Sequence, residues 1–327
     1  MFVSPASRSA RKRPSLIHPN AIPGRLTLLS DATASPVMTT DQASKTTVYW
    51  SPNFGGQWLP LWNGREFVPT DMGGQLSNLS TASSSGAAGP AAVTTNANYD
   101  FFAWFPGRGN KGLLTRGPAW SSDTSRGTGA GTTEIELLKG IWVNKYAIAN
   151  GPPARRGIYL GSARSDGSSQ FNWLLGSRAA GGTAALLGLW NMYNRIPMFP
   201  QVTNTTASYT WAPGGSTTRS AANSTAMRIS FISGLAEDAF QAAYHSIGQN
   251  SNAWSAGIGY DSTTTFSGAG FYGALSTAET GSGSYRTTAV GYHYFQALEW
   301  TGSGTTTFYG APGTGPDGLV LSAAMRM

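Results

Sequence analysis

Residues 49–69 read YWSPNFGGQWLPLWNGREFVP and place six aromatic residues among glycines and prolines. The preceding TTV leads into YWSP, a strand pattern that a Ser-Pro pair ends. GQWLPLWNGREFVP predicts a hairpin, because Asn63 and Gly64 suit the two positive-φ positions of a type I′ turn. Trp58 and Trp62 would then meet Phe67 across the ladder. We expect these rings to fill the core of a small β-meander, with an aromatic ligand platform as the alternative.

The composition of the whole chain favours the same class of fold. The 327 residues include 42 glycines, and only 11% are charged, whereas about a quarter is usual. Short alternating runs bounded by turn residues predict an all-β protein. The absence of cysteine excludes disulfides and thiolate metal sites. No apolar run reaches the ~18 residues of a membrane span, and the N-terminus lacks the apolar core of a signal peptide.

Residues 1–25 form a separate kind of segment, which we interpret as an extended basic arm. The segment holds four prolines, no acidic residue and no usable periodicity. It contributes +5 of the net charge of +7 through Arg8, Arg11, Lys12, Arg13 and Arg25. Since the remaining chain is nearly neutral, we do not expect a nucleic-acid-binding body. The arm is predicted to dock on a partner; a tether to nucleic acid and a solvated tail are the alternatives. The residues predicted to make that docking contact are Arg8, Arg11, Lys12 and Arg13.

The remaining chain divides into four predicted parts. They are a β-meander and hairpin module at 26–80, a linker or long loop at 81–95, a second β module at 96–199 and a jelly-roll-like β-sandwich at 200–327. YDFFAWFPG, residues 99–107, predicts a strand buried on both faces. TAALLGLWNMYNRIP, residues 183–197, is the one segment with helical spacing of apolar residues, although Gly188 shortens it and a strand is the alternative.

Carboxylates are the residues most relevant to catalysis, because polysaccharide depolymerases use paired acids. Candidates are Glu134 and Glu136 in TEIELL, Glu237 and Asp238 in GLAEDAF, and Asp261 in GYDST. Adjacent residues of a strand point to opposite faces, so Glu237 and Asp238 are not expected to flank one bond. A structural role, in turns or against backbone amides, is favoured for these acids.

Other catalytic and metal-binding patterns are missing. His18, His245 and His293 lie apart, and the sequence has no HExxH, no nucleophile elbow and no phosphate-binding loop. A Ser-His-Asp triad assembled from distant segments remains open. We therefore predict no catalytic residue, no metal and no cofactor.

Four aromatic residues are candidates for contact with a glycan or with another subunit: Trp120, Trp211, Trp254 and Tyr260. An aromatic ring beside arginine can stack on a sugar or on a partner surface. Core packing is the alternative, because large rings are mostly buried in small β modules.

The order of several blocks resembles that of a group of phage and prophage structural proteins. The pattern begins with RLTL, a Thr-rich turn, YWSP and the hairpin LWNGREF, where Trp62 and Phe67 occupy the aromatic positions. GPAW, LGLWNMYNRIP, GLAEDA, GIGYDST and GYHYFQALE follow in the same order, so the similarity covers about residues 24–310. The members of this group are described as fibre, spike or other virion components, and the resemblance implies no catalytic residues.

The resemblance implies a structural component of a bacteriophage-type virion, made in the host bacterial cytoplasm. A fibre or spike would dock through its N-terminal part on capsid, portal, neck or tail proteins and expose its sandwich to a host surface glycan. Such appendages are commonly homotrimers. No membrane contact is expected. A capsid decoration or cement protein is the second hypothesis, and a depolymerase with acids near Glu237 or Asp261 is the third.

Overall fold

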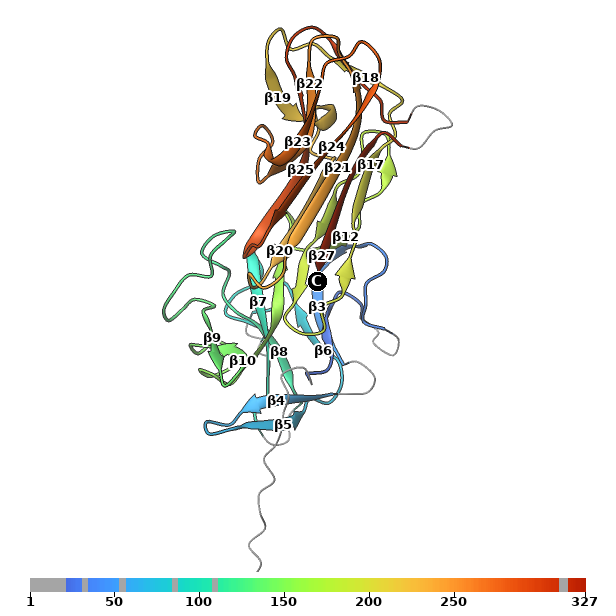
Figure 1. Ribbon diagram of the computed structural model, residues 1–327. Helices are drawn as coiled ribbons and strands as arrows, with labels where there is room; N and C mark the ends of the chain where they lie inside the picture. The colour runs from blue at the N-terminus through green and yellow to red at the C-terminus, as the bar shows by residue number, and fades with distance from the viewer. Residues whose placement is uncertain (1–21, 31–34, 53–56, 84–87, 108–110, 312–316) are drawn as a thin grey trace, which may run out of the picture.

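The computed structural model of the chain describes residues 22–30, 35–52, 57–83, 88–107, 111–311 and 317–327. In these ranges every regular element is a strand except one 3₁₀ turn, η3 (Ala221–Asn223), so the predicted all-β fold is confirmed. Figure 1 shows an elongated body, with long strands of the C-terminal half in its upper part and small sheets in its lower part. No helix within the described ranges is long and apolar enough to cross a membrane.

Three small sheets form the lower part. The three-stranded sheet, in the order β1-β3-β6, consists of β1 (Arg25–Thr27), β3 (Thr47–Ser51) and β6 (Leu76–Leu79). The hairpin consists of β4 (Trp58–Trp62) and β5 (Phe67–Asp71). The six-stranded sheet, in the order β8-β7-β11-β10-β9 with β15 also on β11, consists of β7 (Asn98–Trp104), β8 (Leu113–Arg116), β9 (Ile135–Leu138), β10 (Ile141–Asn144), β11 (Ile158–Arg164) and β15 (Leu189–Asn191). As predicted, β7 is buried on both faces.

The hairpin closes differently from the predicted type I′ turn. The loop spans residues 63–66, and the register pairs Trp62 with Phe67. Asn63 Oδ1 accepts hydrogen bonds from the backbone N–H groups of Arg65 and Glu66, at 2.8 and 3.0 Å. Of the two positions expected to have positive φ, only Gly64 does, because the Asn63 side chain stabilises a longer loop instead.

The aromatic residues of this stretch are divided between core and surface. Trp50 is fully buried, whereas Trp58 is 53% exposed, and Trp62 and Phe67 are half-buried with ring centroids 5.2 Å apart. The expectation that these rings fill one meander core is therefore correct for Trp50 and wrong for Trp58. A two-stranded hairpin has one layer, so it leaves one of its faces in solvent.

The upper part is one large sheet that folds over into a sandwich. In order of sequence its strands are β2 (Gln42–Lys45), β12 (Phe171–Leu174), β13 (Arg178–Ala179), β14 (Ala185–Leu187), β16 (Pro197–Met198), β17 (Gln201–Asn204), β18 (Tyr209–Trp211), β19 (Thr217–Ser220), β20 (Arg228–Ser233), β21 (Phe240–Gln249), β22 (Trp254–Tyr260), β23 (Ser267–Gly273), β24 (Glu279–Thr287), β25 (Gly291–Thr301), β26 (Thr306–Phe308) and β27 (Leu319–Arg326). The main path runs β13-β17-β27-β21-β24-β23-β22-β25-β20-β14-β12-β2. Most pairs are antiparallel, but β13–β17 and β14–β20 are parallel.

The two layers of the sandwich pack through aromatic residues. Strands β23 and β24 share a single paired position, so the sheet divides there. Phe231 on β20 stacks on Phe240 of β21 at 4.4 Å, and Trp254 on β22 meets Phe308 of β26 edge to face at 5.9 Å. Aromatic contacts of this kind contribute beyond their buried area. The predicted β-sandwich character is thus present, but the large sheet also includes β2, β12, β13, β14 and β16, which precede residue 200.

The prediction of a short helix in the segment with helical spacing of apolar residues is wrong. Residues 183–197 form β14, β15 and a bend instead. Gly188 separates the two strands, and a Cβ there would lie 2.5 Å from the carbonyl oxygen of Asn172. Because β14 joins the large sheet while β15 joins the six-stranded sheet, the chain changes sheets at Gly188. Leu189 and Trp190 are buried between the two sheets, which is why apolar residues occur so densely here.

The lower and upper parts share one core. The cluster of buried apolar side chains runs from Ile22 to Met327 without separating at the predicted boundaries. The described part of the predicted linker and its flank forms a loop, residues 80–83 and 88–95. Buried Arg116 holds this loop by donating hydrogen bonds to the carbonyl oxygens of Ala82 and Ala91. Across the junction, the Arg164 guanidinium lies 3.8 Å from the Tyr292 ring and 2.7 Å from Asp123.

The predicted arm is shorter than expected at its C-terminal end. Ile22 is buried, and Arg25 lies in β1 with 3% of its surface exposed, where it donates to the Met327 carbonyl oxygen at 3.1 Å. Burial lowers the pKa of Arg25 to about 10. Arg25 is therefore a core residue. The other predicted arm residues, Arg8, Arg11, Lys12 and Arg13, and also His18, lie outside the described residues.

Candidate functional site

Most acidic side chains of the described chain are held in ion pairs. Nine carboxylates have a basic partner: Asp100, Asp123, Glu134, Glu136, Glu237, Asp238, Asp261, Glu299 and Asp317. Others bind backbone amides, as Asp71 does with the N–H of Gly73. These contacts account for the positions of the carboxylates within the fold. No group of three or more His, Asp or Glu that could hold a metal ion occurs among the described residues.

Glu237 and Asp238 point to the same group, contrary to the expectation from strand geometry. They lie in a turn before β21, and both contact the guanidinium of Arg195, Glu237 at 2.9 Å. The alternation of a strand does not apply to a turn, so adjacent side chains can converge there. Both acids neutralise one arginine, which itself lies over the Trp190 ring at 5.1 Å. The arrangement fits a structural clamp.

His293 and Asp261 form a second pair. His293 Nδ1 lies 2.6 Å from Asp261 Oδ2, and Nε2 lies 3.1 Å from the Val290 carbonyl oxygen. In a Ser-His-Asp triad the second imidazole nitrogen faces a nucleophile. Here it faces a backbone carbonyl, so this histidine has no serine to activate. His245 is an exposed residue of β21.

Trp120 covers a buried polar network around Asp100. The Asp100 carboxylate is fully buried and receives hydrogen bonds from Arg126 Nε at 2.6 Å and from Ser162 Oγ at 2.6 Å. The Arg126 guanidinium also lies 4.3 Å from the centre of the Trp120 ring, which is 6% exposed. Trp120 was a candidate contact residue, but its ring packs on this network and has little surface for a ligand.

Trp211 stands beside a buried acid near the upper end of the molecule. The Arg219 guanidinium lies 4.2 Å from the Trp211 ring and donates to Glu299 at 2.7 Å, while the Tyr209 hydroxyl donates to Glu299 at 2.8 Å. Burial raises the pKa of Glu299 to about 7, although Arg219 and Tyr209 act in the opposite direction. One face of the half-buried Trp211 ring is thus occupied by Arg219.

The last two candidate rings are also engaged inside the fold. Trp254 is fully buried and its indole N–H donates to Glu279 at 3.2 Å, so it cannot contact a glycan or a second subunit in this structure. Tyr260 is half-buried and stacks on His293 with ring centroids 5.1 Å apart. Sequence alone did not separate these rings from surface ones, because every strand of a sandwich has one face in the core.

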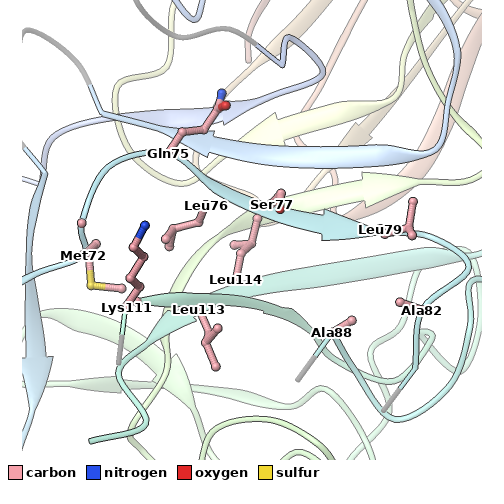
Figure 2. A pocket seen from close by; sticks show the side chains of 12 residues that line it. Met72, Gln75, Leu76, Ser77, Leu79, Ala82, Ala88, Lys111, Leu113 and Leu114 are labelled. Carbon is pink, nitrogen blue, oxygen red and sulfur yellow. The ribbon is translucent and has the colours of Figure 1, made fainter. Parts of the chain in front are cut away.

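Four prominent concavities among the described residues contain few catalytic groups. One has a volume of about 420 Å³ and is lined by Leu76, Leu113 and Leu114. Figure 2 shows these side chains between β6 and β8, with Lys111 at one end. A second, of about 520 Å³, contains Glu237, which is already paired with Arg195. A third, of about 280 Å³ and lined largely by serine and threonine, holds no acid. The four concavities thus contain one carboxylate in total, whereas glycoside hydrolysis ordinarily uses two.

The largest of the four concavities is a groove of about 740 Å³ beside the hairpin. Trp62, Trp104 and Phe105 line it, together with Pro106 and Pro153. Its volume and aromatic lining are typical of a site for a peptide or small ligand. Leu61 and Trp62 of β4 and Val68 and Thr70 of β5 also line it, and this hairpin lies at the lower end of the body (Figure 1).

The opposite end exposes rings that the sequence reasoning missed. We call this the distal end. It is formed by the terminal residues of four paired strands: Thr217 of β19, Thr301 of β25, Trp254 of β22 and Gly273 of β23. One position further in, Tyr272 is 65% exposed and its ring centroid lies 6.1 Å from that of half-buried Trp300. Alternation in FYG, where Phe271 and Tyr272 must face opposite sides, was the available signal.

Comparison with known proteins gives no relative from which a function could be transferred. No protein-family model matches the chain, and no curated protein matches it.

Proposed function

We propose that this protein is a non-enzymatic structural component of a bacteriophage-type virion, a fibre or spike. Its N-terminal part docks on the particle, and its sandwich faces outward. One observation carries the proposal: an elongated β body exposes aromatic side chains at opposite ends, Trp58 at the hairpin and Tyr272 at the distal end. Contiguous apolar groups mark interaction surfaces, and Tyr272 lies beside the half-buried ring of Trp300, with ring centroids 6.1 Å apart. The block order described above supplies the virion context.

The ion pairs support a structural role over the depolymerase hypothesis. Glu237 is tied to Arg195 and Asp261 to His293, so the two segments nominated for that hypothesis present no free acid pair. Removing either acid should therefore affect stability and not a reaction. The decisive measurement is reducing ends released from host capsule: release that stops in Glu237→Gln would favour the enzyme.

The experiment that tests the proposal locates the protein on particles. Virions from cells that carry the encoding phage or prophage are labelled with antibodies to the sandwich and imaged by electron microscopy. We expect label on projecting appendages, at their outer ends. Label spread evenly over the capsid would favour the decoration hypothesis, and its absence from all particles would contradict both.

Docking through the arm has its own test. The deletion should stop at residue 21, because Ile22 and Arg25 belong to the packed body. The shortened protein should fold as the full chain does but should not enter particles. Normal incorporation would show that the arm is not the docking element. Light scattering of the full chain then tests the proposed homotrimer.

A further inference from the structure

The distal end carries one uncharged row of side chains across four strands. The register aligns Thr218 on β19, Trp300 on β25, Ser255 on β22 and Tyr272 on β23. Paired residues of neighbouring strands project on the same face. Buried Glu299 and Ala256 occupy adjacent positions and so point to the opposite face, into the core. The row therefore lies on the outer face of the sandwich.

The two rings of this row lie close together above a small residue. Ser255 stands between them in the register, yet their centroids are only 6.1 Å apart with planes inclined by 35°. Gly302 explains the orientation of Trp300, since a Cβ there would lie 2.9 Å from its Cη2 atom. The indole thus lies against the bend that follows β25. The two rings form one low aromatic surface flanked by hydroxyl groups.

The chemistry of this surface selects an uncharged, hydroxyl-rich partner. No member of the row is charged, and the Glu279 carboxylate nearby accepts hydrogen bonds from Trp254 Nε1 and from the backbone N–H of Leu275. The face of an aromatic ring is electron-rich, so it attracts polarised C–H groups such as those of a sugar ring. Ser255 and Thr218 can exchange hydrogen bonds with sugar hydroxyls.

A second protein subunit fits this surface less well. Stable interfaces bury about 800 Å² on each partner around an apolar core. Two rings among serine, threonine and glycine supply only a small part of that area. A ring-sized ligand fits the pair without leaving charged groups unpaired.

We propose that Tyr272 and Trp300 form a stacking platform for a neutral pyranose unit of a host surface glycan, with Ser255 and Thr218 as hydrogen-bonding partners. This assignment rests on the proposed function, and it replaces the rings nominated from the sequence. Trp120 and Trp254 are buried, and the rings of Trp211 and Tyr260 pack against Arg219 and His293.

The test uses the purified full-length protein and an array of bacterial capsular and O-antigen polysaccharides. We expect binding to neutral polysaccharides, followed by calorimetry with an oligosaccharide cut from the best one. Tyr272→Ala and Trp300→Ala should each reduce affinity at least tenfold. Trp58→Ala, an exposed ring at the other end, is the matched control and should bind normally.

Several results would overturn the platform. They are unchanged affinity in both variants, binding of charged glycans alone, no binding by the unaltered protein, or loss of self-association instead of glycan binding. Tyr272 is largely exposed, so its variant keeps the test valid if Trp300→Ala folds poorly. Particle incorporation of Tyr272→Ala separates the two proposals: it should remain normal when glycan binding fails, whereas absence of the protein from particles contradicts the virion role alone.

Discussion

Replacement of Glu299 by glutamine should make the protein more stable at alkaline pH. The carboxylate has no exposed surface and lies among Tyr209, Arg219 and the inner side of β25. Its pKa rises from an ordinary value of 4.5 to about 7 because burial disfavours the charged form. The folded protein therefore keeps a proton that the unfolded chain has lost between these two pH values. Stability must fall as the pH rises from 4.5 to 7.

The size of the effect follows from the two pKa values. Each pKa unit corresponds to about 1.4 kcal/mol, so the full change is roughly 3 kcal/mol. Glu299→Gln keeps the shape of the protonated acid and removes the titration. At pH 4.5 the variant and the natural protein should differ little in free energy of unfolding. At pH 8 the variant should be more stable by roughly 3 kcal/mol.

Urea denaturation followed by tryptophan fluorescence at pH 4.5, 6 and 8 measures this difference. Glu66→Gln, which removes an exposed carboxylate from the hairpin loop, is the control for lost surface charge. Subtracting the two pH profiles isolates the buried group. The reasoning is refuted if Glu299→Gln and the natural protein show parallel profiles, or if the variant is the less stable one at pH 8.

Three further substitutions test the packing. Arg126→Met leaves the buried Asp100 carboxylate without its cation and should cost about 3–5 kcal/mol in urea unfolding, whereas the exposed Arg155→Met should change little; equal effects would contradict the burial argument. Gly188→Ala forces a Cβ to within 2.5 Å of a backbone oxygen and should lower the melting temperature, while Gly167→Ala, with open space around it, should not. Trp254→Ala should lower the free energy of unfolding by about 3–5 kcal/mol, because the ring is fully buried; a variant as stable as the natural protein would contradict this burial.

Local chemistry was sufficient to predict the fold class. Period-two alternation, frequent glycine and scarce charge act within a few residues, so the all-β class followed from the sequence. The apolar run at residues 99–107 predicted a strand that is buried on both faces, and β7 is buried in this way. The expected contact of Trp62 with Phe67 is present, but it comes from a four-residue loop and not from the predicted turn, and Trp58 pairs with Asp71 instead of meeting Phe67.

What only the tertiary structure decided is which sheet each strand joins and which rings remain outside. Gly188 lets residues 183–197 pass from one sheet to another. Apolar residues of this segment are buried on both of its sides, and their spacing therefore resembled that of a helix. Arg195 draws two adjacent acids together because they lie in a turn. Trp254 and Tyr272 lie in neighbouring rows of paired residues and therefore on opposite faces of one sheet; Trp254 is buried and Tyr272 is exposed. Alternation along a strand distinguishes its two faces, but only the packing of a second layer determines which face is buried.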